Sequence, residues 1–94
     1  MNITGIIWLE DIVDKIERKH AVTSAEVAAV MAQNPSFRFV EKGHRSNENV
    51  YAALGQTDAG RFLIVYFVYK PDGRALVLSA RGMTQRERQA YEHR

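Results

Sequence analysis

The chain has 94 residues, no cysteine and a formal net charge of +2. This length is typical of a single domain, and the absence of cysteine excludes disulfides and cysteine-based metal sites. No apolar run approaches the roughly 20 residues of a membrane span, and the first residues lack the basic start and long apolar core of a signal peptide. We therefore expect one soluble, cytoplasmic domain over residues 1–94 that does not bind membranes.

The positive charge is concentrated in the C-terminal third. Residues 1–42 carry five Lys/Arg and six Asp/Glu, residues 43–60 carry one and two, and residues 61–94 carry seven and three. The net charges of these segments are therefore −1, −1 and +4. Basic surface attracts nucleic acid, but on charge alone a few arginines that keep the protein soluble are the simpler explanation.

Two helices are predicted in the first third of the chain, after a short apolar strand at 5–9. In the first helix, which ends near His20, apolar residues recur at helical spacing: Leu9, Ile12, Val13 and Ile16. The second helix begins at a capping box made by Thr23 and Glu26. It ends at Asn34, because the residue before a proline disfavours helical geometry.

Four strands are predicted in the second half, at 36–42, 49–56, 61–69 and 74–80. Segment 61–69 is almost entirely apolar, which is typical of a central strand covered on both faces. The turn sequence "KPDGR" joins it to the next strand as a hairpin. We predict an antiparallel meander of about four strands, with two N-terminal helices and one C-terminal helix kept apart from it, which makes an α+β fold.

The last predicted helix has very little to bury. Thr84 and Glu87 form a second capping box that starts it at about Gln85. Apart from Met83, just ahead of it, only Ala90 and Tyr91 are suited to an interior. A solvated terminal helix pinned by these few residues is one interpretation, and a functional basic surface is the other.

A series of short motifs runs through the chain in a fixed order. They are Trp8, Lys19-His20 and Val22, then Gly55, Thr57, Gly60 and Arg61, then Ser79-Ala80-Arg81, and last Thr84, Glu87, Arg88 and Tyr91. Over nearly the whole chain this pattern resembles the BrnT family of toxins from bacterial type II toxin–antitoxin systems. The resemblance implies a fold similar to RelE-type ribonuclease toxins and an RNA-cleaving activity that inhibits translation and growth. It also implies a cognate antitoxin, encoded next to the toxin, that blocks the activity in a hetero-oligomer.

Three positions of the first helix depart from the family pattern. Ile12 and Ile16 stand where the family usually has Lys and Asn, and Ala21 stands where it usually has Gly. The substitutions make this helix more apolar, as expected of a divergent branch of the family.

RNA cleavage without a metal needs a base for the 2′-hydroxyl, cations for the phosphate and an acid for the leaving 5′-oxygen. Histidine has the ordinary pKa closest to neutral pH, and arginine binds two phosphate oxygens at once. We predict His20, Arg81 and Arg88 as catalytic residues, with His20 as acid or base and Arg81 as the phosphate clamp.

We predict four substrate-binding residues: Lys19, Arg45, Arg61 and Tyr91. Structural alternatives stay open for several candidates, since His20 is also a favourable cation at a helix C-terminus and Tyr91 is also an anchor for the last helix. Arg61 is also the start of a strand. The three histidines lack ligand-like spacing, so we expect neither a metal nor another cofactor.

Three functions remain open at this point. The chain is a ribonuclease toxin, a non-catalytic RNA-binding relative with the same basic surface, or a protein-interaction domain whose tail docks a partner. Turnover separates the first from the other two. Salt dependence separates the second from the third, because phosphate contacts weaken steeply with salt.

Overall fold

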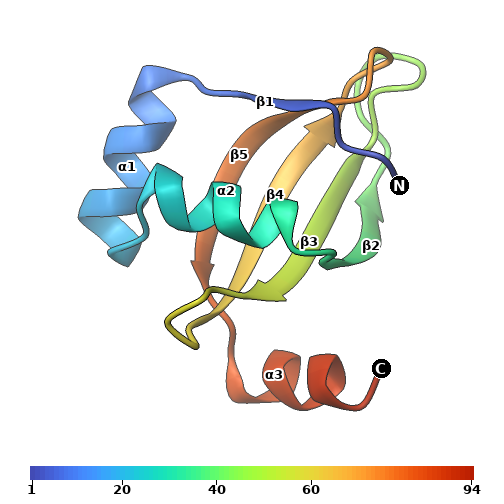
Figure 1. The fold of residues 1–94 in the computed structure, drawn as a ribbon. Coiled ribbons are helices and arrows are strands. Elements are labelled where there is room, and N and C mark those ends of the chain that lie inside the picture. The colour runs from blue at the N-terminus through green and yellow to red at the C-terminus, as the bar shows by residue number, and fades with distance from the viewer.

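The fold is described here from a computed structural model that covers residues 1–94 (Figure 1). The sheet contains β1 (Gly5–Ile7), β2 (Ser36–Glu41), β3 (Val50–Gln56), β4 (Phe62–Tyr69) and β5 (Arg74–Gly82). The helices are α1 (Glu10–His20), α2 (Ser24–Ala32) and α3 (Gln85–Glu92). The predicted α+β class and the positions of all three helices are confirmed.

The sheet differs from the predicted four-stranded antiparallel meander. Its order is β1-β5-β4-β3-β2, and β1 is a fifth strand that lies parallel to β5, with Gly5 opposite Arg74 and Ile7 opposite Leu76. The remaining pairs are antiparallel. A parallel partner is always remote in sequence, so nothing in a three-residue apolar run could have revealed this pairing.

Both predicted capping boxes are present. The Thr23 hydroxyl accepts a hydrogen bond from the Glu26 N–H, Thr84 does the same for Glu87, and each glutamate accepts one in return from the backbone N–H of its threonine. These contacts satisfy backbone donors that the first helical turn leaves unpaired. α2 ends at Ala32, slightly before Asn34. None of the three helices is long and apolar enough to cross a membrane.

The main core lies between α1, α2 and one face of the sheet. Its fully buried members come from both helices, the turn between them and the three central strands: Ile16, Val22, Val27, Val30, Ala53, Leu63, Val65, Phe67, Val77 and Ala80 among others. Ile12 and Trp8 pack against this cluster. The two isoleucines that depart from the family pattern are therefore accommodated by packing, and we call this side of the sheet the covered face.

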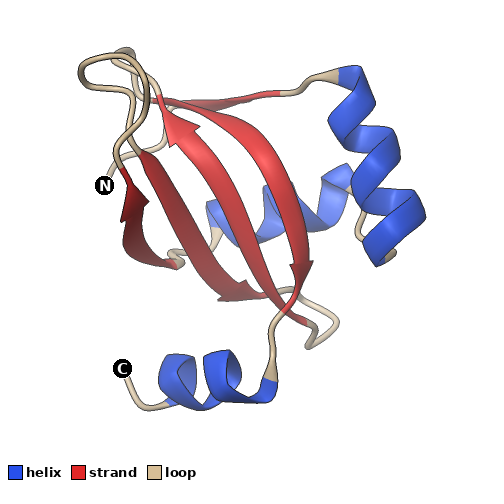
Figure 2. Ribbon diagram, turned by 180° about the vertical axis from the view of Figure 1, so that it is seen from behind, coloured by secondary structure: helices blue, strands red, loops and turns tan.

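The opposite face of the sheet is largely bare, as the view from behind shows (Figure 2). We call it the open face. A small cluster of Ala52, Leu54 and Ile64 is buried there, with Tyr66, Met83 and Tyr91 packed against it. α3 therefore covers one end of this face only, and Tyr66 and Val68 remain half-buried. The prediction that segment 61–69 is covered on both faces is correct for that end alone.

Candidate functional site

Arg81 reaches the open face at the end of β5, where α3 begins. Its neighbour Ala80 points into the covered face, and since side chains alternate along a strand, Arg81 points the other way, opposite Ile64. Two of its nitrogens donate to Glu87, Nη1 to Oε1 at 2.7 Å and Nη2 to Oε2 at 2.9 Å. Nη2 also donates to the Tyr66 hydroxyl at 3.1 Å.

The Arg81–Glu87 pair is held in its charged form. Hydrogen bonds from Arg81, followed by the backbone hydrogen bond from Thr84, lower the pKa of Glu87 to about 2 despite partial burial. The hydrogen bond to Glu87 likewise raises the pKa of Arg81 above its already high ordinary value. A carboxylate with so low a pKa is a weak base near neutral pH. Glu87 is therefore the counter-ion of Arg81 in this structure.

The sequence-based account explained Glu87 by its capping box alone and missed this ion pair. Oε1 accepts from the Thr84 N–H at 2.8 Å and from Arg81, while Oε2 accepts from Arg81. The signal that could have found it is that a capping box occupies only one of the two carboxylate oxygens. An arginine just before the helix is in reach of the other oxygen.

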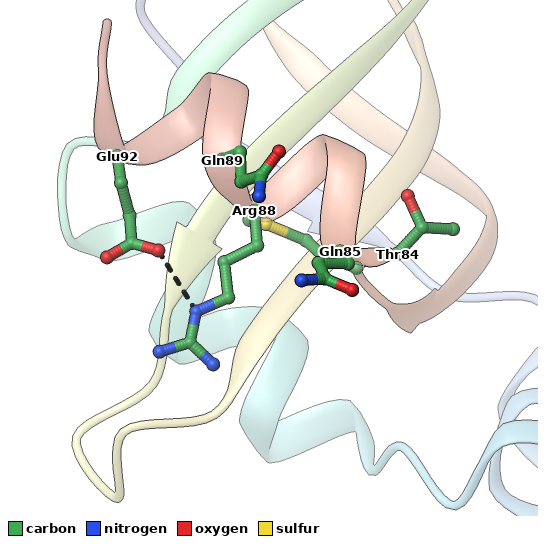
Figure 3. A pocket seen from close by; sticks show the side chains of 6 residues that line it. Thr84, Gln85, Arg88, Gln89 and Glu92 are labelled. Atoms are coloured by element: carbon green, nitrogen blue, oxygen red, sulfur yellow. Dashed lines mark hydrogen bonds and ion pairs between the residues drawn. The ribbon is translucent and has the colours of Figure 1, made fainter.

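Arg88 and Tyr91 meet at Phe62, on the same end of the open face. The Arg88 guanidinium lies 4.0 Å from the Phe62 ring centre, and the Tyr91 ring meets Phe62 edge-on at 6.1 Å. Nε of Arg88 donates to Glu92 at 3.1 Å. Arg88 and Glu92 line a pocket of about 440 Å³, and Figure 3 shows their side chains joined by this hydrogen bond. The pocket is lined by Met83, Thr84, Gln85, Arg88, Gln89 and Glu92.

His20 and Lys19 end α1, which packs on the covered face through Ile12 and Ile16. The structure thus brings Arg81, Arg88 and Tyr91 to one end of the open face, whereas His20 ends a helix on the covered face. His20 is half-buried and Lys19 is exposed.

Arg61 also belongs to the corner around His20. Its guanidinium donates to the backbone carbonyls of Ala21 at 2.6 Å and His20 at 3.1 Å, and it forms an ion pair with Glu26 at 3.1 Å. These contacts hold the junction between α1 and α2 against the start of β4. Sequence reasoning left open whether Arg61 binds substrate or only starts a strand, and its contacts are those of a structural residue.

Arg45 lies at the other end of the open face. It lines an open pocket of about 460 Å³ with Lys42, His44, Val50, Val68 and Leu78, among others. Val68 is four residues along β4 from Ile64, the residue opposite Arg81, which corresponds to about 13 Å of strand. The sequence analysis did not name Arg38 among the basic residues of the site. Arg38 is exposed and lies opposite Ala52, so it adds positive charge to the open face. His, Asp and Glu side chains form no group of three or more that could hold a metal ion.

The family model for the ribonuclease toxin BrnT of type II toxin–antitoxin systems matches residues 8–87. The chain belongs to the BrnT toxin family. The match includes Arg81, Glu87 and His20, and it ends before Arg88 and Tyr91. No match is found among curated proteins. The resemblance inferred from the short motifs is therefore confirmed. The family belongs to type II toxin–antitoxin systems, which implies an antitoxin partner.

Proposed function

We propose that this chain is itself an active endoribonuclease that cleaves RNA without a metal and thereby inhibits translation and growth. In this proposal it acts in the bacterial cytoplasm and is neutralised in a complex with an antitoxin encoded beside it. Membership of the BrnT family supports the proposal, as does packing of two helices on one face of the antiparallel strands, which is consistent with a RelE-type fold. The observation that carries it is the bidentate capture of a carboxylate by Arg81 on the open face.

Glu87 occupies the position that we assign to the RNA phosphate. A carboxylate bound through both oxygens presents to a guanidinium the same pair of acceptors as two phosphate oxygens. Arg81 is therefore already oriented for bidentate binding. α3, which carries Glu87, contributes no fully buried residue, so little packing opposes a shift of this helix when a phosphate replaces the carboxylate.

The reaction that we propose begins with attack of the ribose 2′-oxygen on phosphorus. An O2′–P bond forms, the P–O5′ bond breaks, a base accepts the 2′-hydroxyl proton and an acid protonates the 5′-oxygen. Arg81 and Arg88 would stabilise the charge that builds on the phosphate. Tyr91, beside Phe62, offers an aromatic surface for a base.

Two residues are proposed for proton transfer. The sequence-based hypothesis assigns it to His20, which ends a helix on the covered face, whereas Arg81 reaches the open face. The Tyr66 hydroxyl lies directly at Arg81 and accepts a hydrogen bond from it, which leaves the hydroxyl's own hydrogen free to donate. We therefore propose Tyr66 as the acid at the 5′-oxygen and solvent water as the acceptor of the 2′-hydroxyl proton, and we retain His20 as the alternative for either role.

The remaining binding residues are proposed to act at a distance from the cleaved bond. Arg45, at the far end of the open face, would contact the same RNA strand two or so nucleotides away. Lys19 adds charge at the His20 corner. Arg61, also predicted to bind substrate, already donates to three protein groups, so we assign it at most a minor share of binding.

Cleavage of a defined RNA in EDTA by the purified chain tests this proposal. We expect Arg81→Ala to lower the cleavage rate roughly 100-fold, as loss of one transition-state donor does in other enzymes. Arg81→Lys should recover only part of the rate, because an ammonium group cannot bind two oxygens in a planar fork. Tyr66→Phe should slow cleavage, and His20→Ala should not.

Arg86→Ala is the matched control, since Arg86 is an exposed arginine on the same helix. Activity lost by His20→Ala and kept by Tyr66→Phe would return proton transfer to His20. Cleavage that survives Arg81→Ala would disprove the site. RNA binding that is salt-dependent, with no cleavage of free or ribosome-bound RNA, would identify the chain as a non-catalytic relative.

A further inference from the structure

The outer edge of β2 is an exposed apolar strand edge. β2 is the last strand in the sheet order, so one side of its backbone has no partner strand. Phe39 is 54% exposed and Val40 is 40% exposed, and they are two of only four large apolar residues exposed in the molecule. Unpaired strand edges are templates for another strand, and proteins usually shield them with charge, proline, a β-bulge or a covering segment.

Two unpaired charges flank these apolar residues on one face of the strand. Arg38 lies opposite Ala52, and Glu41 lies opposite Val50. Both partners point to the open face, so Arg38 and Glu41 point there as well, because opposite residues of an antiparallel pair share a face. Neither charge has an ion-pair partner, since all five ion pairs of the chain involve other residues.

A bulge in β2 creates this arrangement. The register shifts between Phe39 and Glu41, and such a bulge places one extra residue in the strand. Residues three apart, which would otherwise face opposite sides, therefore share the open face. Phe39 meets Tyr51 edge-on at 5.8 Å on the other side of the sheet, so charge and apolar surface are segregated to the two faces of one edge.

We propose that a second copy of this chain adds its own β2 to this edge, antiparallel, with the two-fold axis between Phe39 and Val40. Arg38 of each protomer then lies opposite Glu41 of the other, and Phe39 of each lies opposite Val40 of the other. A strand with a cation at one end and an anion at the other becomes its own complement when it is reversed. This self-complementarity favours a second copy over a strand from an unrelated protein.

Analytical ultracentrifugation of the full chain over a concentration series tests the proposal, with no RNA and no antitoxin present. We expect a monomer–dimer equilibrium. Arg38→Glu and Glu41→Arg should each raise the dimer dissociation constant about tenfold, because each replaces two opposite-charge pairs by two like-charge pairs. The double variant R38E/E41R restores both pairs with reversed sign and should dimerise like the wild type.

A mixture of the two single variants provides the sharpest outcome. One variant is acidic at both positions and the other is basic at both, so they should form a heterodimer more readily than either pairs with itself. Arg18→Glu, which changes an exposed charge on α1, is the matched control and should leave dimerisation unchanged. A wild-type chain that stays monomeric at all concentrations would overturn the proposal, as would a dimer that neither single variant weakens.

Discussion

Two arginine–glutamate pairs in this molecule are built on the same plan and are held very differently. Arg61 binds Glu26 and Arg81 binds Glu87, and each glutamate is also the capping-box residue of a helix. Arg61 additionally binds two backbone carbonyls, and the helix it holds, α2, is packed into the core. α3 contributes no fully buried residue, so its ion pair and the half-buried Tyr91 join it to the sheet.

The pKa values of Glu26 and Glu87 are both lowered, but the largest cause differs between them. For Glu26 the largest cause is the backbone hydrogen bond within the capping box, whereas for Glu87 it is the hydrogen bonding of Arg81. The first pair is therefore mainly a helix start that an arginine reinforces. The second is mainly an arginine–carboxylate contact. A competing anion can break such a contact without unfolding the core, which is consistent with the proposed release of Arg81 to RNA.

The largest expected effect is the difference in the free energy of unfolding between the Arg61→Ala and Arg81→Ala variants. Arg61→Ala removes the donor for two backbone carbonyls and the partner of Glu26, and should lower the free energy of unfolding by about 2 kcal/mol. Arg81→Ala should lower it by about 1 kcal/mol, since it leaves one backbone carbonyl without its donor, that of Gly82, whereas Arg61→Ala leaves two. Urea denaturation measures both. Equal losses would mean that the Arg81 pair is as structural as the Arg61 pair.

A smaller effect concerns pH. Because the folded-state pKa of Glu87 is lowered from 4.5 to about 2, the stability from its ion pair is present above about pH 4.5 and is lost as the pH falls toward 2. Glu87→Gln should therefore be less stable than the wild type by about 1 kcal/mol at neutral pH. Thermal unfolding scans should show that this difference shrinks below pH 4.5. A difference that stays constant with pH would show that the charge of Glu87 is not its source.

The same Glu87→Gln variant also tests the release of Arg81. A neutral amide holds the guanidinium less strongly than a carboxylate, so RNA should bind more tightly to the variant even though its fold is less stable. Fluorescence anisotropy with a labelled RNA would measure this affinity. Weaker binding by a folded Glu87→Gln variant would contradict the assignment of the Glu87 position to the phosphate.

The smallest expected effect lies at the Arg61 corner. Ala21 ends α1 with φ of 52°, in the left-handed region that glycine adopts without steric cost. Ala21→Gly should raise the free energy of unfolding by about 0.5 kcal/mol, after allowance for the greater freedom of glycine in the unfolded chain. Differential scanning calorimetry measures the shift. Ala25→Gly is the control. Ala25 lies within α2, so glycine there should lower the free energy of unfolding.

The structural features that depend on neighbouring residues in the sequence could be predicted. Both capping boxes, the hairpin turn before Arg74 and the four long strands depend on neighbouring residues, and the structure contains them all. The pairing of β1 with β5 depends on residues far apart, and it was missed. The same limit applied to the candidate site, because no local pattern tells that α1, which ends at His20, packs on the covered face while Arg81 reaches the open face, or that Arg61 folds back onto the end of α1.

The pairing of β1 with β5 has a consequence for synthesis. Gly5 pairs with Arg74, so β1 cannot join the sheet until the residues between Gly5 and Arg74 have been synthesised. Closing so long a loop is an entropic cost paid late and by a non-local contact. The hairpins of β2 to β4 can form as they are made, but the complete sheet becomes available only after Arg74, Ala75 and Leu76 have been made.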